Sequence, residues 1–181
     1  RPPPACPTIA PSTPLLNAKP ARPRRSGGRA AGIARPELRR YLALGDSYTI
    51  GEGVASAECW PVRLARRLNE SGIPVGAPEI IARTGWTTDE LASAIAAADL
   101  TTTDSFDLAT LLIGVNDQYR GRPLAEYEPG FDHLLQLAAV FAGDASRVIV
   151  LSIPDWGVTP FAEGRDRAEI ASHIDAFNAS A

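Results

Sequence analysis

Four short apolar runs alternate with helix-like segments after residue 40, and this alternation constrains the fold more than any other feature. The runs occupy residues 41–44, 79–82, 108–113 and 147–153, and each has the length of one buried strand. Segments with apolar residues at helical spacing separate the runs. Continuous apolar strands that alternate with helices are typical of a parallel sheet covered on both faces. We therefore predict an α/β domain with three layers, α/β/α.

Helix-start signals stand between these runs. Pro61 suits the first turn of one helix, and Thr87 with Glu90 has the spacing of a capping box. Pro129 is expected to open a third helix, and Asp166 to cap the last one.

The first 40 residues differ from the rest of the chain. They hold nine Lys and Arg, one acidic residue and nine of the 16 prolines, whereas residues 41–181 carry nine basic and 20 acidic residues. Such a segment has too little apolar surface to offset its chain entropy. We predict a disordered basic leader over residues 1–40 and a single folded domain over residues 41–181. A basic tail can also bind nucleic acid or an anionic membrane, but this one has no helical stripe and no interleaved aromatic residues, so we expect no nucleic-acid partner.

Composition excludes several classes of protein. No stretch approaches 18 consecutive apolar residues, which argues against a membrane-spanning helix. Two cysteines, Cys6 and Cys59, are too few for a disulfide scaffold, and with two histidines they show no metal-ligand spacing. We expect no cofactor and no metal. No intact export signal is visible, which favours a cytoplasmic location, and the oligomeric state stays open.

The loops that follow the predicted strands contain the residues suited to chemistry. In an open parallel sheet, ligands bind outside the carboxyl ends of the strands. Gly45-Asp46-Ser47 follows the first strand, Gly85 follows the second, and Gly114-Val115-Asn116-Asp117 follows the third. These loops are expected to meet at one edge of the sheet.

Together the three blocks resemble the SGNH (GDSL-type) hydrolase family, from about Tyr41 to the end of the chain. The resemblance implies a flavodoxin-like strand order 2-1-3-4 and a serine esterase or lipase-like enzyme that works through an acyl-serine intermediate. Ser47 would be the nucleophile. The backbone N–H groups of Ser47 and Gly85 and the side-chain amide of Asn116 would form the oxyanion hole. The substrate would be a small-molecule acyl ester, with short acyl esters, lysophospholipids, thioesters and O-acetylated sugars all open.

Each of these residues also has a purely structural interpretation. Ser47 alone could cap the helix that follows the first strand, and Asn116-Asp117 could form a plain turn. Asp46 is expected to be a hydrogen-bonding group behind the nucleophile. Trp86 and Trp156 could line an acyl pocket or simply pack at the sheet edge.

Two further residues, Arg120 and Arg122, could meet an anionic substrate, but a solvated loop is the expectation for both. Cys59 is expected to be a small packed side chain.

The resemblance is incomplete, because the family has a fourth block, Asp-x-x-His, that supplies the base and its orienting acid. The chain has only His133 and His173, and Gly130 and Ile170 stand three residues before them. We expect a C-terminally incomplete domain that lacks a last strand and helix, with impaired activity and an uncovered sheet edge. The alternative is a catalytically inactive binding protein with the SGNH fold. A flavodoxin-like nucleotide binder is a weaker alternative, since the glycine-rich phosphate signatures are absent.

Overall fold

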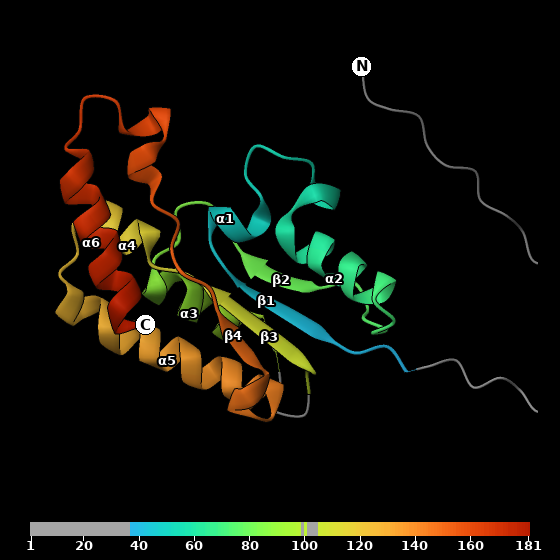
Figure 1. The fold of residues 1–181 in the computed structure, drawn as a ribbon. Coiled ribbons are helices and arrows are strands. Elements are labelled where there is room, and N and C mark those ends of the chain that lie inside the picture. Colours follow the sequence, from blue (N-terminus) through green and yellow to red (C-terminus); the bar gives the residue numbers. More distant parts are fainter. Residues whose placement is uncertain (1–36, 99, 101–104) are drawn as a thin grey trace, which may run out of the picture. The chain divides into compact units, whose positions relative to one another are not determined.

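The computed structural model describes residues 37–98, 100 and 105–181, and its centre is a sheet of four parallel strands (Figure 1). The strands lie in the order β2-β1-β3-β4. Their bounds are Tyr41–Gly45 for β1, Glu79–Ala82 for β2, Leu108–Leu112 for β3 and Val148–Val150 for β4. This order confirms the predicted flavodoxin-like parallel sheet. The first 36 residues of the predicted leader lie outside the described residues.

Helices cover both faces of the sheet, which confirms the three-layer prediction (Figure 1). Their bounds are Ser47–Ile50 for α1, Trp60–Glu70 for α2, Thr88–Ala97 for α3, Val115–Tyr119 for α4, Leu124–Ala142 for α5 and Arg167–Ser180 for α6. None of the helices in the described part of the chain combines the length and apolar character needed to cross a membrane.

Side-chain alternation along β1 divides the core into two clusters. Tyr41 and Ala43 face α2, where they pack with a small cluster that includes Ala65. Leu42 and Leu44 face the opposite side and belong to the larger cluster, which α3, α5 and α6 complete. All four side chains are buried, because β1 lies between β2 and β3 and both of its faces are covered. The central strand therefore ends at a fixed place, directly before Ser47.

Three of the four predicted helix starts are confirmed. Pro61 lies in the first turn of α2, Thr87 and Glu90 form a capping box, and the Asp166 carboxylate accepts hydrogen bonds from the first turn of α6. The prediction for Pro129 is wrong: α5 begins at Leu124 and contains Pro129 in its interior.

Burial explains the earlier start of α5. Tyr127 is fully buried and stacks against the ring of Phe131, with 5.5 Å between the ring centroids. The two rings lie four residues apart, so one helical face carries both into the core. This contact offsets the single hydrogen bond that Pro129 removes from the helix.

The fourth strand is shorter than predicted. Backbone pairing with β3 continues to the N–H of Leu151, which donates to Leu111, and then stops. The backbone of Ile153 instead forms two hydrogen bonds with the side chain of Asn178 on α6, at 2.7 and 3.0 Å. The chain therefore leaves the sheet three residues earlier than its apolar run suggests.

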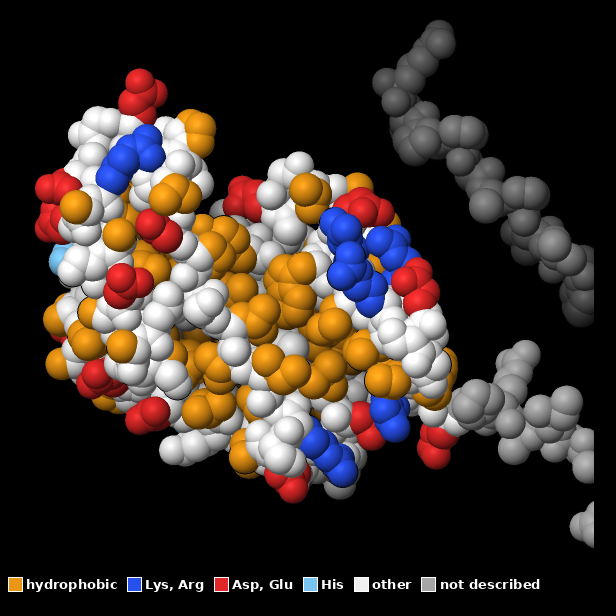
Figure 2. Space-filling model, viewed as in Figure 1, with side chains coloured by type: hydrophobic (Ala, Val, Ile, Leu, Met, Phe, Trp, Pro, Cys, Tyr) orange, Lys and Arg blue, Asp and Glu red, His pale blue; other side chains and the backbone are white. Residues whose placement is uncertain are grey.

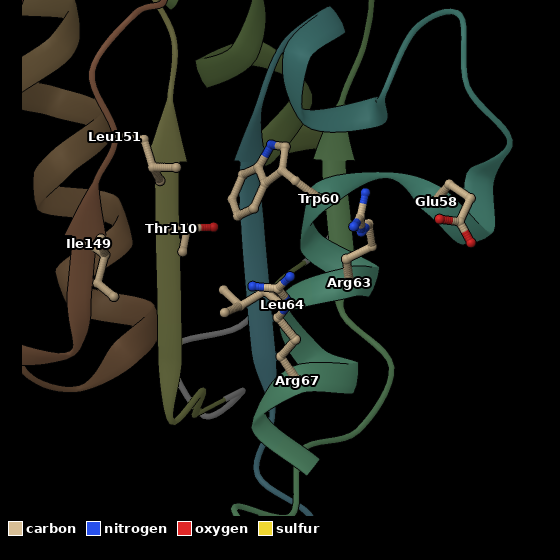
Figure 3. Close-up of a pocket in the computed structure, with 8 residues that line it drawn as sticks. All are labelled: Glu58, Trp60, Arg63, Leu64, Arg67, Thr110, Ile149 and Leu151. Carbon is tan, nitrogen blue, oxygen red and sulfur yellow. The ribbon is translucent and has the colours of Figure 1, made fainter. Parts of the chain in front are cut away.

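One part of the sheet surface carries exposed apolar side chains. On the face that α2 covers in part, Ile149 of β4 is 51% exposed, and Figure 2 shows hydrophobic side chains gathered over the middle of the molecule in this view. Val150 is 36% exposed and points to the other face of the sheet, because side chains alternate along a strand. Between β3, β4 and α2 lies a groove of about 500 Å³, in which Trp60 and Leu64 extend from α2 toward the sheet (Figure 3).

Candidate active site

Ser47 is the first residue of α1 and directly follows the central strand. A side chain at Gly45 would collide with Thr49 and with the carbonyl of Leu112, so only glycine fits where the chain turns from β1 into α1. Asp46 is the N-cap: its Oδ1 accepts a hydrogen bond from the backbone N–H of Tyr48 at 3.0 Å. The interpretation of Ser47 as the helix cap is therefore wrong, because Asp46 is the cap. Asp46 is thus the hydrogen-bonding group that the sequence predicted next to Ser47. Ser47 is partly exposed toward a pocket.

Gly85 lies in the loop between β2 and α3. Its φ of +85° is in the left-handed region, which L side chains rarely adopt, so the residue type follows from the backbone conformation. A tight turn accompanies it, in which the N–H of Trp86 donates to the carbonyl of Arg83 at 3.3 Å.

Asn116 is the second residue of α4, directly after β3. Its Nδ2 donates one hydrogen bond to the carbonyl of Trp86 at 2.8 Å. A primary amide carries two N–H groups, so the second remains for another acceptor. The bond fixes the amide beside the Gly85 loop.

Ser47, Gly85 and Asn116 line a single pocket of about 220 Å³. The structure therefore brings together all three residues that the sequence singled out, from the ends of three neighbouring strands. Seven other residues complete the lining: Tyr48, Glu52, Thr84, Val115, Tyr119, Trp156 and Phe161. Glu52 is the charged residue of this lining, and its carboxylate accepts a hydrogen bond from the Thr84 hydroxyl at 2.9 Å.

Two buried carboxyl groups, Asp46 and Asp117, are the chain neighbours of Ser47 and Asn116 and do not themselves line the pocket. Burial raises the pKa of Asp46 to about 7, the Tyr48 N–H opposes this rise, and the nearby charge of Asp117 adds to it. Asp46 Oδ2 is buried without a hydrogen-bond partner among the described residues. Burial also raises the pKa of Asp117, although hydrogen bonds from Thr88 and the charge of Arg122 oppose this rise.

Asp117 attaches α3 to α4. Its carboxylate accepts hydrogen bonds from the Thr88 backbone N–H at 3.1 Å and from the Thr88 hydroxyl at 3.0 Å. Arg122 approaches the same carboxylate at 3.4 Å and pairs with Asp89 at 2.6 Å. These bonds hold the loop that contains Gly85 against the helix that contains Asn116.

Arg120 and Arg122 lie in the solvent-accessible turn between α4 and α5 that the sequence suggested, and their side chains also make specific contacts. Arg120 donates to the carbonyl of Gly85 at 2.5 Å, and Arg122 binds Asp89 and Asp117 as described above. No local pattern shows these contacts, because their partners lie 35, 33 and five residues away in the chain. The sequence gives only one hint of these contacts, which is that both arginines closely follow the motif that contains Asn116.

Aromatic side chains form one wall of the pocket. Trp156 is almost fully buried, and its indole N–H donates to Gln118 at 2.9 Å. Tyr119 and Phe161 pack edge-on against it and are themselves 41% and 68% exposed. Trp156 thus both packs at the sheet edge and lines the pocket, whereas Trp86 packs against the larger core cluster.

Both histidines lie elsewhere. His173 on α6 lines a neighbouring cavity, whose lining shares Tyr119 and Trp156 with the Ser47 pocket. His133 is exposed on α5. Cys59 is buried, as expected for a packed side chain. Residues 37–98, 100 and 105–181 contain no cluster of three or more His, Cys, Asp or Glu that could hold a metal ion.

Comparison with known proteins gives a family match over most of the chain. The model of the GDSL-like Lipase/Acylhydrolase family matches residues 43–181. No curated protein matches the chain.

Similar solved structures share the fold. The crystal structure of TesA is 22% identical, with a TM-score of 0.59 over 78% of this chain and 70% of that one. The esterase AlinE4, described as an SGNH-hydrolase family member, is 24% identical, with a TM-score of 0.56 over 81% and 73%. A lipase/acylhydrolase from Enterococcus faecalis is 17% identical, with a TM-score of 0.59 over 79% and 71%. The family match and the parallel sheet agree, and the chain belongs to the GDSL-like lipase/acylhydrolase family.

Proposed function

We propose that this domain hydrolyses small-molecule acyl esters through an acyl intermediate on Ser47. The observation that carries the proposal is the common pocket of Ser47, Gly85 and Asn116. A nucleophile and two candidate oxyanion donors from separate strand ends meet there. Family membership supports hydrolysis as the class of reaction.

In the proposed reaction, the Ser47 hydroxyl oxygen attacks the ester carbonyl carbon and its proton passes to a base. The carbonyl oxygen gains the negative charge and accepts hydrogen bonds from the N–H groups of Ser47 and Gly85 and from the second N–H of Asn116. The protonated base gives its proton to the leaving oxygen, and the alcohol departs to leave the acyl-serine. Water then attacks the acyl carbon, which releases the carboxylic acid and restores the Ser47 hydroxyl. Each oxyanion donor of this kind lowers the barrier by about 3–4 kcal/mol.

A second candidate function is ester binding without turnover. The observation that favours it is the position of His133 and His173, neither of which is part of the Ser47 pocket lining. Serine is a weak nucleophile until a base accepts its proton. The two candidate functions therefore differ in whether a base is available to accept the Ser47 proton.

The test supplies that base from solution. Hydrolysis of p-nitrophenyl acetate is measured for the 181-residue chain and for Ser47→Ala, with and without imidazole. The proposal expects turnover that depends on Ser47 and that rises with imidazole beyond the uncatalysed imidazole reaction. Equal rates for the two proteins at every imidazole concentration would contradict it. A thermal shift with a non-hydrolysable ester analogue, combined with those equal rates, would identify a binding protein.

A further inference from the structure

Arg120 connects the two elements that carry the candidate oxyanion donors. It is the C-cap residue of α4, and its backbone N–H donates to the carbonyl of Asn116 at 3.0 Å. Its side chain extends to the loop after β2, where Nη2 donates to the carbonyl of Gly85 at 2.5 Å. A Cβ built on Gly85 would lie 3.7 Å from this nitrogen, so the guanidinium rests directly against the glycine.

The same guanidinium contacts the first turn of α3. The Glu90 carboxylate lies 3.3 Å from Nη2 and also accepts the backbone N–H of Thr87 at 2.9 Å. Arg120 therefore links the glycine to the capping box that begins the next helix.

Two other hydrogen bonds hold the neighbouring residues of the loop. Asn116 binds the carbonyl of Trp86, and Glu52 binds the hydroxyl of Thr84. Gly85 lies between these two residues and has no side chain of its own. Glycine is the most permissive residue type in the backbone. The peptide unit that follows Gly85 is held at both ends, since its N–H, on Trp86, donates to Arg83 and its carbonyl, on Gly85, accepts from Arg120.

We propose that Arg120 is a positioning residue: by holding the peptide unit that follows Gly85, it limits rotation about the glycine and so keeps the Gly85 N–H, in the preceding peptide unit, directed at the developing oxyanion. The inference rests on the proposed function and adds a residue to its machinery. Arg120 is 45% exposed and its pair with Glu90 is exposed too, so the pair contributes little to global stability. Its contribution is geometric, since a displacement of about 1 Å at a catalytic group lowers a rate by about 100-fold.

The experiment compares Arg120→Ala, Arg120→Lys and a control, Arg66→Ala. Arg66 is also an exposed arginine beside a carboxylate, Glu58 at 3.9 Å, and it lies outside the Ser47 pocket. Ester turnover is measured over a range of substrate concentrations. Amide hydrogen exchange is measured for residues 83–88 and for the rest of the domain.

The inference expects Arg120→Ala to lower kcat about tenfold to 100-fold with KM within twofold, and to accelerate exchange in residues 83–88 alone. Arg120→Lys should recover part of kcat, because an ammonium can still donate to the Gly85 carbonyl. Arg66→Ala should match the unmodified chain.

Equal kcat for Arg120→Ala and Arg66→Ala would overturn the inference. So would faster exchange throughout the domain, because that result marks a general loss of stability. If the unmodified chain shows no turnover that depends on Ser47, the proposed function fails, and with it the catalytic role of Arg120. In that case, unchanged exchange in residues 83–88 would also show that Arg120 does not hold the loop.

Discussion

Substitution of single side chains in the pocket can show what each contributes to the proposed reaction, and Asn116 gives the clearest case. Replacing Asn116 with alanine removes the proposed oxyanion donor together with the bond to the Trp86 carbonyl, while the small side chain still suits a short helix. We expect kcat to fall by about 100-fold to 1,000-fold, which corresponds to the loss of one such donor. Steady-state kinetics with a short acyl ester checks this, and a matched melting temperature shows that the fold persists. A variant with unchanged kcat would remove Asn116 from the oxyanion hole.

Glu52 gives the pocket lining a negative charge, which predicts a preference among substrates. Glu52→Gln removes this charge but keeps an oxygen that accepts the Thr84 hydroxyl. We expect the ratio of kcat/KM for acetylcholine to that for its neutral analogue, 3,3-dimethylbutyl acetate, to fall about threefold to tenfold. Glu58→Gln, outside this pocket, is the control and should leave the ratio unchanged. The same ratio in all three proteins would show that Glu52 does not act on the substrate.

Asp46 predicts how stability depends on pH. Its pKa rises from the ordinary 3.8 to about 7 on folding, so the folded state binds the proton more tightly than the unfolded state does. The stabilisation from the protonated form is complete below about pH 4 and is lost as pH rises through about 7. Each unit of pKa corresponds to about 1.4 kcal/mol of unfolding free energy.

Asp46→Asn tests this dependence, because the amide oxygen can still accept the Tyr48 N–H. We expect the free energy of unfolding of the variant to fall less between pH 4 and pH 8 than that of the unmodified chain. Some slope should remain, since burial also raises the pKa of Asp117. Denaturant titrations across this range provide the measurement. Parallel curves for the two proteins would contradict a buried, protonated Asp46.

Among the helices, α3 and α4 depend on each other through Asp117. Asp117→Ala leaves the Thr88 N–H without its acceptor and removes a charged partner of Arg122. We expect a loss of about 2–3 kcal/mol in unfolding free energy. The control, Asp89→Ala, removes a 64% exposed carboxylate bound to the same arginine and should cost less than about 1 kcal/mol. Equal losses would mean that the buried carboxylate does not hold the two helices together.

The sequence predicted the ends of helices and strands correctly where neighbouring residues determine those ends. The capping box of Thr87 and Glu90 is complete within four residues, and the sequence located the start of α3 from it. The ends of α5 and β4 depend on distant partners. Tyr127 is buried against the ring of Phe177 on α6 as well as that of Phe131, and Ile153 leaves the sheet to bind Asn178, 25 residues further on. No window around Pro129 or residue 150 contains that information.

The candidate site divides in the same way. Ser47, Gly85 and Asn116 could be predicted because motifs mark them and the sheet order brings the strand ends together. The role of Arg120 could not be predicted, since its hydrogen bond joins it to a glycine in another loop. The resemblance to the family was enough to propose the reacting groups. The side chains that hold those groups in place could be identified only from the three-dimensional structure.

At the scale of the whole molecule, the exposed face at β4 predicts association. A strand edge and an apolar surface that water contacts are both sites of self-association. We expect the double variant Ile149→Thr with Leu151→Thr, two residues that line the same groove, to lower the concentration-dependent association of the chain, since threonine keeps strand propensity and adds a hydroxyl. Sedimentation velocity over a range of concentrations measures this.

The matched control for that face is Val140→Thr. Val140 is 51% exposed, as Ile149 is, but it lies on α5 away from the groove. It should leave the association unchanged. If the control and the double variant associate to the same degree as the unmodified chain, the β4 face is not the surface responsible.

The central claim, that Ser47 is a nucleophile beside an oxyanion hole, has one direct measurement. The chain is incubated with an alkyl fluorophosphonate, and its mass and modified peptide are determined by mass spectrometry. The account predicts a single phosphonyl adduct on Ser47, which is absent from Ser47→Ala and forms more slowly in Asn116→Ala. An unmodified chain after prolonged incubation, or an adduct on another residue, would contradict it.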